Sequence, residues 1–215
     1  MDSQVPTTPR ERYRTQVRAE IKQHAWEQIA SAGASALSLN AIAKQLGMSG
    51  PALYRYFAGR DELLTELVQD AYRSLADAVR AAAEAPGAEP GLLARALYRW
   101  ALDDPQRYLL IYGTPIPGYH APDGTTAVAA EIMDLLISAF AALPPAAPVP
   151  FDDYLATHRD WAGGHPAPAA VLRRALTFWT RLHGLISLQV AGHFAGMGFD
   201  PERFFEAEVD QLLAP

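Results

Sequence analysis

The side chains best suited to specific chemistry gather in one short stretch, where small residues, two tyrosines and an arginine follow one another. These residues are Gly50, Pro51, Ala52, Tyr54, Arg55 and Tyr56. Small residues fit close to the base edges of DNA, and a proline ring offers apolar contact to a thymine methyl group. Tyrosine and arginine side chains reach phosphate or base. The combination is unusual for a solvated helix and indicates contact with nucleic acid.

The surrounding segment, residues 37–64, supplies the elements that would position these side chains. It predicts a short helix capped by Ser38, a tight turn containing Gly47, and a second short helix. Leu53 and Phe57 are expected to face inward, against Ile42, Ala43 and Leu46 of the first helix. This is a helix-turn-helix arrangement, in which the start of the second helix enters the major groove. Without the turn pattern, the same residues would favour a helical hairpin with an aromatic core.

This segment resembles the DNA-binding signature of the TetR family of transcriptional regulators. The matching elements are Ser38, Ile42-Ala43, Gly47-Met48-Ser49, Leu53-Tyr54-Arg55-Tyr56-Phe57, Arg60 and Leu63-Leu64. The resemblance implies a homodimer in which each subunit offers one recognition helix to a palindromic operator, most often as a repressor that a small ligand releases. We therefore expect DNA contacts from Ser38, Asn40, Lys44, Ser49, Gly50, Pro51, Ala52, Tyr54, Arg55, Tyr56 and Arg60.

Three positions depart from the usual pattern of the family. Gly50 and Ala52 stand where lysine or threonine is common, so base readout is expected to depend on Pro51, Tyr54 and DNA shape. Arg60 stands where lysine is usual. Its charge at a helix N-terminus suits a phosphate, whereas Pro51 is expected to meet the floor of the groove.

Charge is distributed unevenly along the chain. The 215 residues carry a formal net charge of −6, yet residues 1–60 hold eight Lys/Arg against four Asp/Glu. The first segment is therefore basic and the remainder acidic, which suits a protein that touches phosphate with one end only.

Helical periodicity and Pro/Gly breaks predict an all-α fold, without strand alternation. About nine helices are expected, near 9–32, 39–46, 50–58, 60–85, 91–102, 105–113, 125–143, 169–194 and 201–213, with a short piece near 151–157. Residues 1–59 would form the helix-turn-helix domain, and residues 60–215 an effector-binding and dimerisation domain.

The predicted helix 169–194 is apolar nearly all round, so it must pack against its own domain and against something else. In TetR-like proteins the last two helices form a four-helix interface with the second subunit. Expected interface residues are Leu176, Leu185, Leu188, Phe204 and Phe205. The alternative is a fully internal helix in a monomer.

Trp179 and His183 share one face of that helix and, with Gly184, resemble a Trp…His-Gly motif from one branch of TetR-like C-terminal domains. We expect a pocket for an apolar or aromatic ligand, the alternative being a packed core. Its expected lining residues are Trp100, Tyr108, Tyr112, Phe140, Trp161, Phe178, Trp179 and His183.

Enzymatic and metal-binding classes find little support in the residue pattern. The chain has no cysteine, and its six histidines form neither an H-E-x-x-H nor a Glu-x-x-His pair. No glycine-rich phosphate loop or G-x-S-x-G is present. We expect a cytoplasmic protein that needs no cofactor, metal or membrane. A DNA-binding architectural or division factor without an effector is the alternative function.

Overall fold

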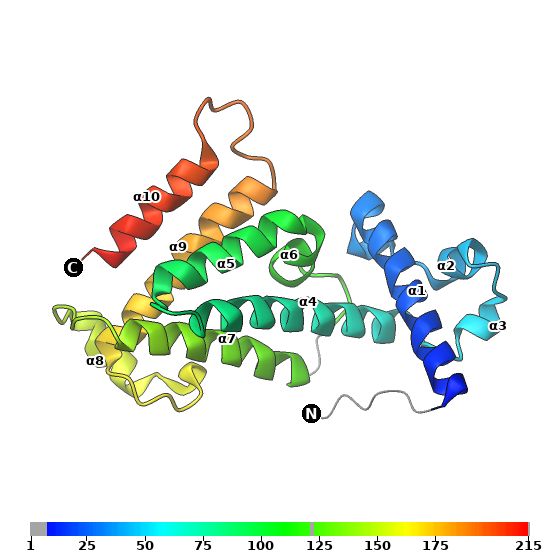
Figure 1. Cartoon of the computed structure of the whole chain (residues 1–215), viewed down its shortest axis with the longest axis horizontal. Coiled ribbons are helices and arrows are strands. Elements are labelled where there is room, and N and C mark those ends of the chain that lie inside the picture. Colours follow the sequence, from blue (N-terminus) through cyan, green and yellow to red (C-terminus); the bar gives the residue numbers. More distant parts are fainter. Residues whose placement is uncertain (1–7, 121–122, 215) are drawn as a thin grey trace. The chain divides into compact units, whose positions relative to one another are not determined.

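A computed structural model of the chain describes residues 8–120 and 123–214 (Figure 1). Over these residues the protein consists of ten α-helices and two short 3-10 turns, with no strand. The all-helical fold expected from the sequence is confirmed. The chain divides into two compact units, residues 1–70 with 114–121, and residues 71–113 with 122–215. The second unit therefore begins inside α4 (Arg60–Ala83), eleven residues beyond the expected start of the second domain at residue 60.

The first unit contains α1 (Pro9–Ala32), the turn η1 (Ala34–Ala36), α2 (Leu39–Gln45), α3 (Gly50–Leu53) and the first part of α4 (Arg60–Ala83). Capping residues define its helix starts. Thr8 and Glu11 form a capping box on α1, and Ser38 accepts from the backbone N–H of Ala41 on α2. The fully buried side chains of this core are Ile21, Ala25, Ile42, Leu53, Phe57, Leu63, Leu64 and Leu67.

The second short helix of the helix-turn-helix is shorter than the sequence predicts. α3 spans only residues 50–53, and a tight turn replaces the expected continuation to residue 58. The N–H of Tyr56 donates to the carbonyl of Leu53 at 2.8 Å, an i→i+3 bond that tightens the chain. The turn still directs Phe57 into the core, where it is fully buried.

The second unit contains the rest of α4 together with α5 (Pro90–Asp103), α6 (Pro105–Tyr112), α7 (Asp123–Ala141), α8 (Pro150–Thr157), η2 (Asp160–Ala162), α9 (Ala169–Val190) and α10 (Pro201–Leu213). Proline opens four of these helices, because its fixed φ suits the first helical position. α9 lies at the centre, packed against α5, α6, α7, α8 and α10.

The structure differs from the sequence-based expectation in the number of helices and in the residues at which two of them end. The segment 150–157 is a helix in its own right, so the expected eighth and ninth helices are α9 and α10. α9 ends at Val190 and not at Phe194, because Gly192 adopts φ 79° and the chain leaves the helix there. α4 likewise ends at Ala83, two residues early.

α7 has the length and composition of a membrane-crossing helix over residues 124–141. In the structure it packs against α9 and α5 through the buried side chains of Ile132, Leu136, Ile137 and Phe140. Core helices of soluble proteins also meet this criterion of length and composition, so α7 alone is weak evidence for a membrane span.

The turn between α2 and α3 depends on Gly47, whose φ of 63° lies in the left-handed region. Replacing Gly47 with alanine should lower the free energy of unfolding by about 1–2 kcal/mol, because a Cβ is disfavoured there. No atom lies within 4 Å of that Cβ position, so the cost is conformational. Gly124→Ala is the matched control, since Gly124 is exposed in the first turn of α7 without positive φ. Equal urea midpoints for the two variants would show that the left-handed φ of Gly47 carries no such cost.

Candidate nucleic-acid interface and aromatic cluster

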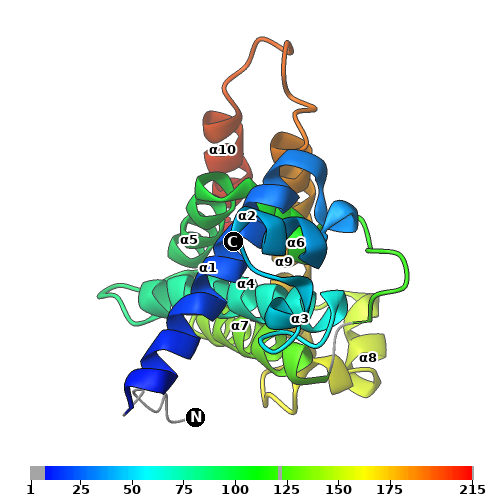
Figure 2. The same ribbon diagram turned by 90° about the vertical axis from the view of Figure 1, so that its right-hand side faces the viewer.

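α2 and α3 lie next to each other in the first unit (Figure 2), and their exposed side chains form one surface. Six of the residues expected to contact DNA are exposed, namely Asn40, Lys44, Ser49, Pro51, Tyr54 and Arg55. Five are partly buried, namely Ser38, Gly50, Ala52, Tyr56 and Arg60. A Cβ on Gly50 would lie 3.7 Å from Oδ1 of Asn40, so the two helices meet where α3 begins. The surface therefore combines side chains of α2 with those at the N-terminal end of α3. In helix-turn-helix motifs this end of the second helix enters the major groove.

The buried side of this surface is held by Arg18 of α1. Its guanidinium carbon lies 4.1 Å from the centre of the Phe57 ring. The same guanidinium donates to the carbonyl of Tyr56 and to the carboxylate of Glu66 on α4. One turn along α1, Lys22 donates to Asp70 at 2.6 Å. α1, the end of the helix-turn-helix and the start of α4 are thus fastened together, a role of Arg18 that the sequence pattern did not reveal.

Arg60 has protein partners at the position where the sequence predicts a phosphate contact. Its Nη2 donates to the carbonyl of Ala34 at 3.0 Å and to that of Ser35 at 3.4 Å. Its Nη1 lies 3.5 Å from a carboxylate oxygen of Asp61. Arg60 therefore braces the start of α4 against η1. Lys44 and Arg55 are exposed cations, whereas Arg60 is partly buried.

Four of the residues expected to line a pocket form a cluster of rings in the second unit. The ring of His183 lies 4.0 Å from that of Trp179 and 4.2 Å from that of Tyr112, between centroids. Nδ1 of His183 lies 3.0 Å from the hydroxyl of Tyr108, which also meets Oγ of Ser187 at 2.8 Å. Burial lowers the pKa of His183 to about 4 and raises the pKa of Tyr112. The cluster is thus neutral at physiological pH.

The other expected lining residues lie in different surroundings. Phe140 and Phe178 pack edge to face at 5.1 Å, and Nε1 of Trp100 donates to Oγ of Ser74 at 3.1 Å. Trp161, in η2, is 37% exposed and takes no part in the cluster. Sequence reasoning could not separate these cases, because all of them are aromatic residues at helical spacing.

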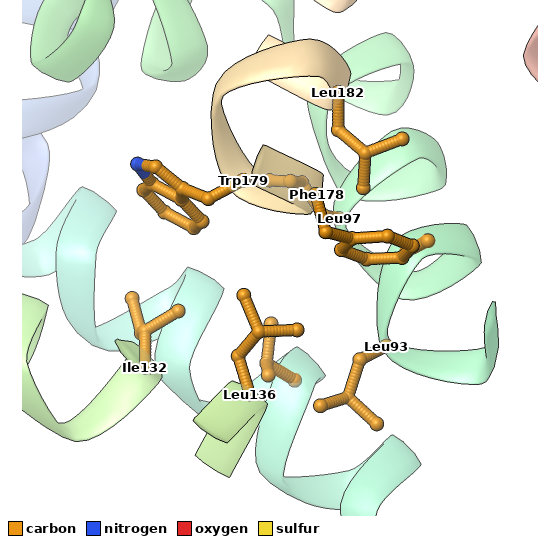
Figure 3. Close-up of a pocket in the computed structure, with 9 residues that line it drawn as sticks. Leu93, Leu97, Ile132, Leu136, Phe178, Trp179 and Leu182 are labelled. Carbon is orange, nitrogen blue, oxygen red and sulfur yellow. The ribbon is translucent and has the colours of Figure 1, made fainter. Parts of the chain in front are cut away.

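An apolar void adjoins the cluster, with Trp179 in its wall (Figure 3). Its lining residues are Val79, Leu93, Ala94, Leu97, Ile132, Leu136, Phe178, Trp179 and Leu182. The void measures about 20 Å³, room for about one water. Packed rings and leucines thus occupy the region where the sequence predicts a pocket, and a larger ligand requires side chains to move.

The five expected interface residues fall into two groups. Leu188 on α9 and Phe204 on α10 are 46% and 41% exposed, and Leu176 is partly buried. Leu185 and Phe205 are buried inside their own subunit, the latter with its ring stacked 4.0 Å from that of Tyr98. Leu185 and Phe205 therefore hold α9 and α10 on the domain and have almost no surface left for a partner.

The lowered pKa of His183 predicts how stability depends on pH. Below about pH 6.5 the unfolded chain takes up a proton at this position, whereas the folded chain stays neutral until about pH 4. His183 therefore contributes its full stability above pH 6.5, and up to about 3 kcal/mol is lost as pH falls to 4. His183→Asn should flatten the decline of the melting temperature over this range. The matched variant His193→Asn, at an exposed histidine, should keep the wild-type decline. Identical pH profiles for all three proteins would contradict the effect of burial on His183.

Comparison with known proteins agrees with this geometry in both units. The model of the bacterial regulatory proteins of the TetR family matches residues 21–67, and that of the tetracyclin repressor-like C-terminal domain matches residues 91–212. The HTH-type transcriptional regulator Rv1816 of Mycobacterium tuberculosis is 38% identical over 218 residues, covering 94% of this chain and 92% of the relative.

Solved structures show the same fold. The crystal structure of the protein SCO4313 is 66% identical, with a TM-score of 0.89, covering 97% of this chain and all of that one. PfmR of Thermus thermophilus, a TetR family transcriptional regulator, has a TM-score of 0.56 at 18% identity, covering 90% of this chain and 96% of PfmR, which supports the fold alone. With family models matching both units and a relative aligned over nearly the whole length, the chain belongs to the TetR family of DNA-binding transcriptional regulators.

Proposed function

We propose that this regulator is a homodimeric cytoplasmic repressor, which binds a palindromic operator and is released by a small apolar or aromatic ligand. The observation that carries the proposal is the exposed surface of α2 and α3. It combines two cations, Lys44 and Arg55, with the small or aromatic side chains of Pro51 and Tyr54. Cations positioned for phosphate beside groups that fit a groove are what sequence-specific binding requires.

The roles within this surface follow from side-chain chemistry. Lys44 and Arg55 carry charge that attracts phosphate without regard to sequence. Pro51, exposed in the first turn of α3, offers apolar contact to a thymine methyl. Tyr54 is 48% exposed, and its ring packs on sugar or base while its hydroxyl donates to phosphate.

Dimerisation is supported by exposed apolar side chains on α9, on α10 and on the segment that joins them. These are Leu188, Met197, Phe199 and Phe204. Gly184, on α9, has no atom within 4 Å of its Cβ position, so a second helix could approach closely there. A twofold dimer presents two recognition elements to two half-sites, which is why such operators are palindromic.

Ligand release is supported by the composition of the second unit's interior, where an apolar void lies beside a cluster of neutral rings. The small size of that void favours one alternative, a DNA-binding architectural factor that responds to no small molecule. The two functions differ in a direct observable. A ligand-gated repressor changes its affinity for DNA when a compound binds, whereas an architectural factor does not.

Arg55→Ala should weaken binding to every DNA sequence alike and reduce the slope of log affinity against log salt by about one unit. Arg99→Ala is the matched control, because Arg99 is an exposed arginine on α5. Fluorescence anisotropy at several salt concentrations measures both slopes. The phosphate assignment fails if the Arg55 and Arg99 variants behave alike.

Pro51→Gln should change which operator is preferred, by about 1–3 kcal/mol at the contacted base pair, and leave the salt slope unchanged. Selection of bound sequences from a random DNA pool, run in parallel for both proteins, measures the preference. If the selected consensus sequence is the same for both proteins, Pro51 does not contact a base pair in the groove.

The double variant Leu188→Glu/Phe204→Glu should sediment as a monomer at micromolar concentration, because two charges would be desolvated in the interface. Its circular dichroism spectrum should stay helical, since both side chains are substantially exposed. Phe151→Glu is the control, because Phe151 is 48% exposed on α8. A wild-type monomer, or a dimeric double variant, would contradict dimerisation through α9 and α10.

A further inference from the structure

One buried polar atom in the ring cluster has no partner among the described residues. Nε2 of His183 is buried and makes no hydrogen bond. The other ring nitrogen, Nδ1, faces the hydroxyl of Tyr108. Because the two nitrogens point away from each other, Nε2 faces away from that hydroxyl. A buried donor or acceptor without a partner destabilises the protein, so a group that pairs with it gains affinity.

Trp179 contacts both the imidazole of His183 and the apolar void. Its indole lines the void together with Ile132 and Leu136, as Figure 3 shows, and it also packs against the imidazole of His183 at 4.0 Å. Trp179 and His183 are one turn apart on α9. A movement of the indole would therefore extend the void towards the imidazole of His183.

We propose that Nε2 of His183 anchors a neutral aromatic effector through one hydroxyl group, and that Trp179 is the gate between the apolar void and this anchor. The inference rests on the proposed release by a ligand and names the chemical class of that ligand. The apolar part of the effector lies at the void among Leu93, Leu136 and Phe178, which widens as these side chains move to admit it.

A hydroxyl is the group that fits because the protonation of His183 has two possible arrangements. If Tyr108 donates to Nδ1, then Nε2 carries the proton and donates; if Nδ1 donates to Tyr108, then Nε2 accepts. A hydroxyl serves in either case, since it both donates and accepts.

The surroundings exclude a charged effector. The lining of the void holds no acidic or basic side chain, and the cluster adds only tyrosines, a tryptophan and a neutral imidazole. An ionised ligand would lose its hydration without gaining a counter-ion.

Three naphthalene probes of similar size test the proposal on the full-length protein, by thermal shift and by quenching of tryptophan fluorescence. They are 2-naphthol, 2-methylnaphthalene and 2-naphthoate, which carry a hydroxyl, a methyl and a carboxylate group. The wild-type protein should bind 2-naphthol about ten times more tightly than 2-methylnaphthalene, because one buried polar atom gains its partner. Binding of 2-naphthoate should be weaker than that of both.

Two substitutions of His183 distinguish the contributions of its two ring nitrogens. His183→Asn keeps a polar atom near the position of Nδ1 and removes Nε2, so the preference for 2-naphthol should disappear. His183→Gln places a polar atom near the position of Nε2, so part of the preference should return. Trp179→Ala removes the gate, so both neutral probes should bind more tightly while the preference persists.

Several results would overturn the proposal. They are equal wild-type affinity for 2-naphthol and 2-methylnaphthalene, a preference that survives His183→Asn, and failure of 2-naphthol to bind either the wild-type or the Trp179→Ala protein up to its solubility limit. The wild-type comparison stands even if a His183 variant does not fold.

Binding to the selected operator, measured in parallel, distinguishes this inference from the proposed function. If 2-naphthol binds in a His183-dependent way but leaves operator affinity unchanged, the proposed release by a ligand is wrong. The proposed hydrogen bond to His183 is then still supported. If a compound releases the operator and binds equally well to His183→Asn, the proposed anchoring by His183 is wrong. The proposed release by a ligand is then still supported.

Discussion

The packing of Arg18 on the buried ring of Phe57 is the contact on which the DNA-binding unit depends. α3 is only four residues long, too short to hold its own direction, so its geometry must come from the residues around it. Phe57 anchors the turn after α3 in the core, while Arg18 covers the ring and pairs with Glu66 on α4. Removing this arginine would loosen three elements at once. Since Pro51, Tyr54 and Arg55 are exposed side chains of the same short segment, their exposure follows from the burial of Phe57.

The interior of the second unit is likewise held by close packing of side chains. Large rings pack around His183 at centroid distances near 4 Å, and the void beside them measures only about 20 Å³. Dense packing of this kind resists gradual deformation, so a ligand that enters must displace whole side chains. Such a displacement is a discrete event, which is the kind of change that a regulated DNA-binding protein needs.

Sequence reasoning recovered the features that depend on local pattern. The helix-turn-helix, the inward Leu53 and Phe57, and the outward Pro51 and Tyr54 follow from spacing, capping and turn residues, which act within a few positions. Features that depend on distant partners were not predictable. Arg60 meets the carbonyl of Ala34, and Phe205 stacks on Tyr98, because the fold brings separate helices together. Trp161 resembled a pocket residue because composition does not reveal which aromatic side chains remain at the surface.

Hydrogen–deuterium exchange of the free and DNA-bound protein tests the central claim most directly, using DNA selected from a random pool. The surface of α2 and α3 combines positive charge, exposure and small residues, which suit groove binding. Peptides covering residues 38–56 should therefore gain protection in the complex, with scrambled DNA producing less. Protection confined to other segments, with residues 38–56 exchanging equally with and without the selected DNA, would contradict DNA binding through this surface.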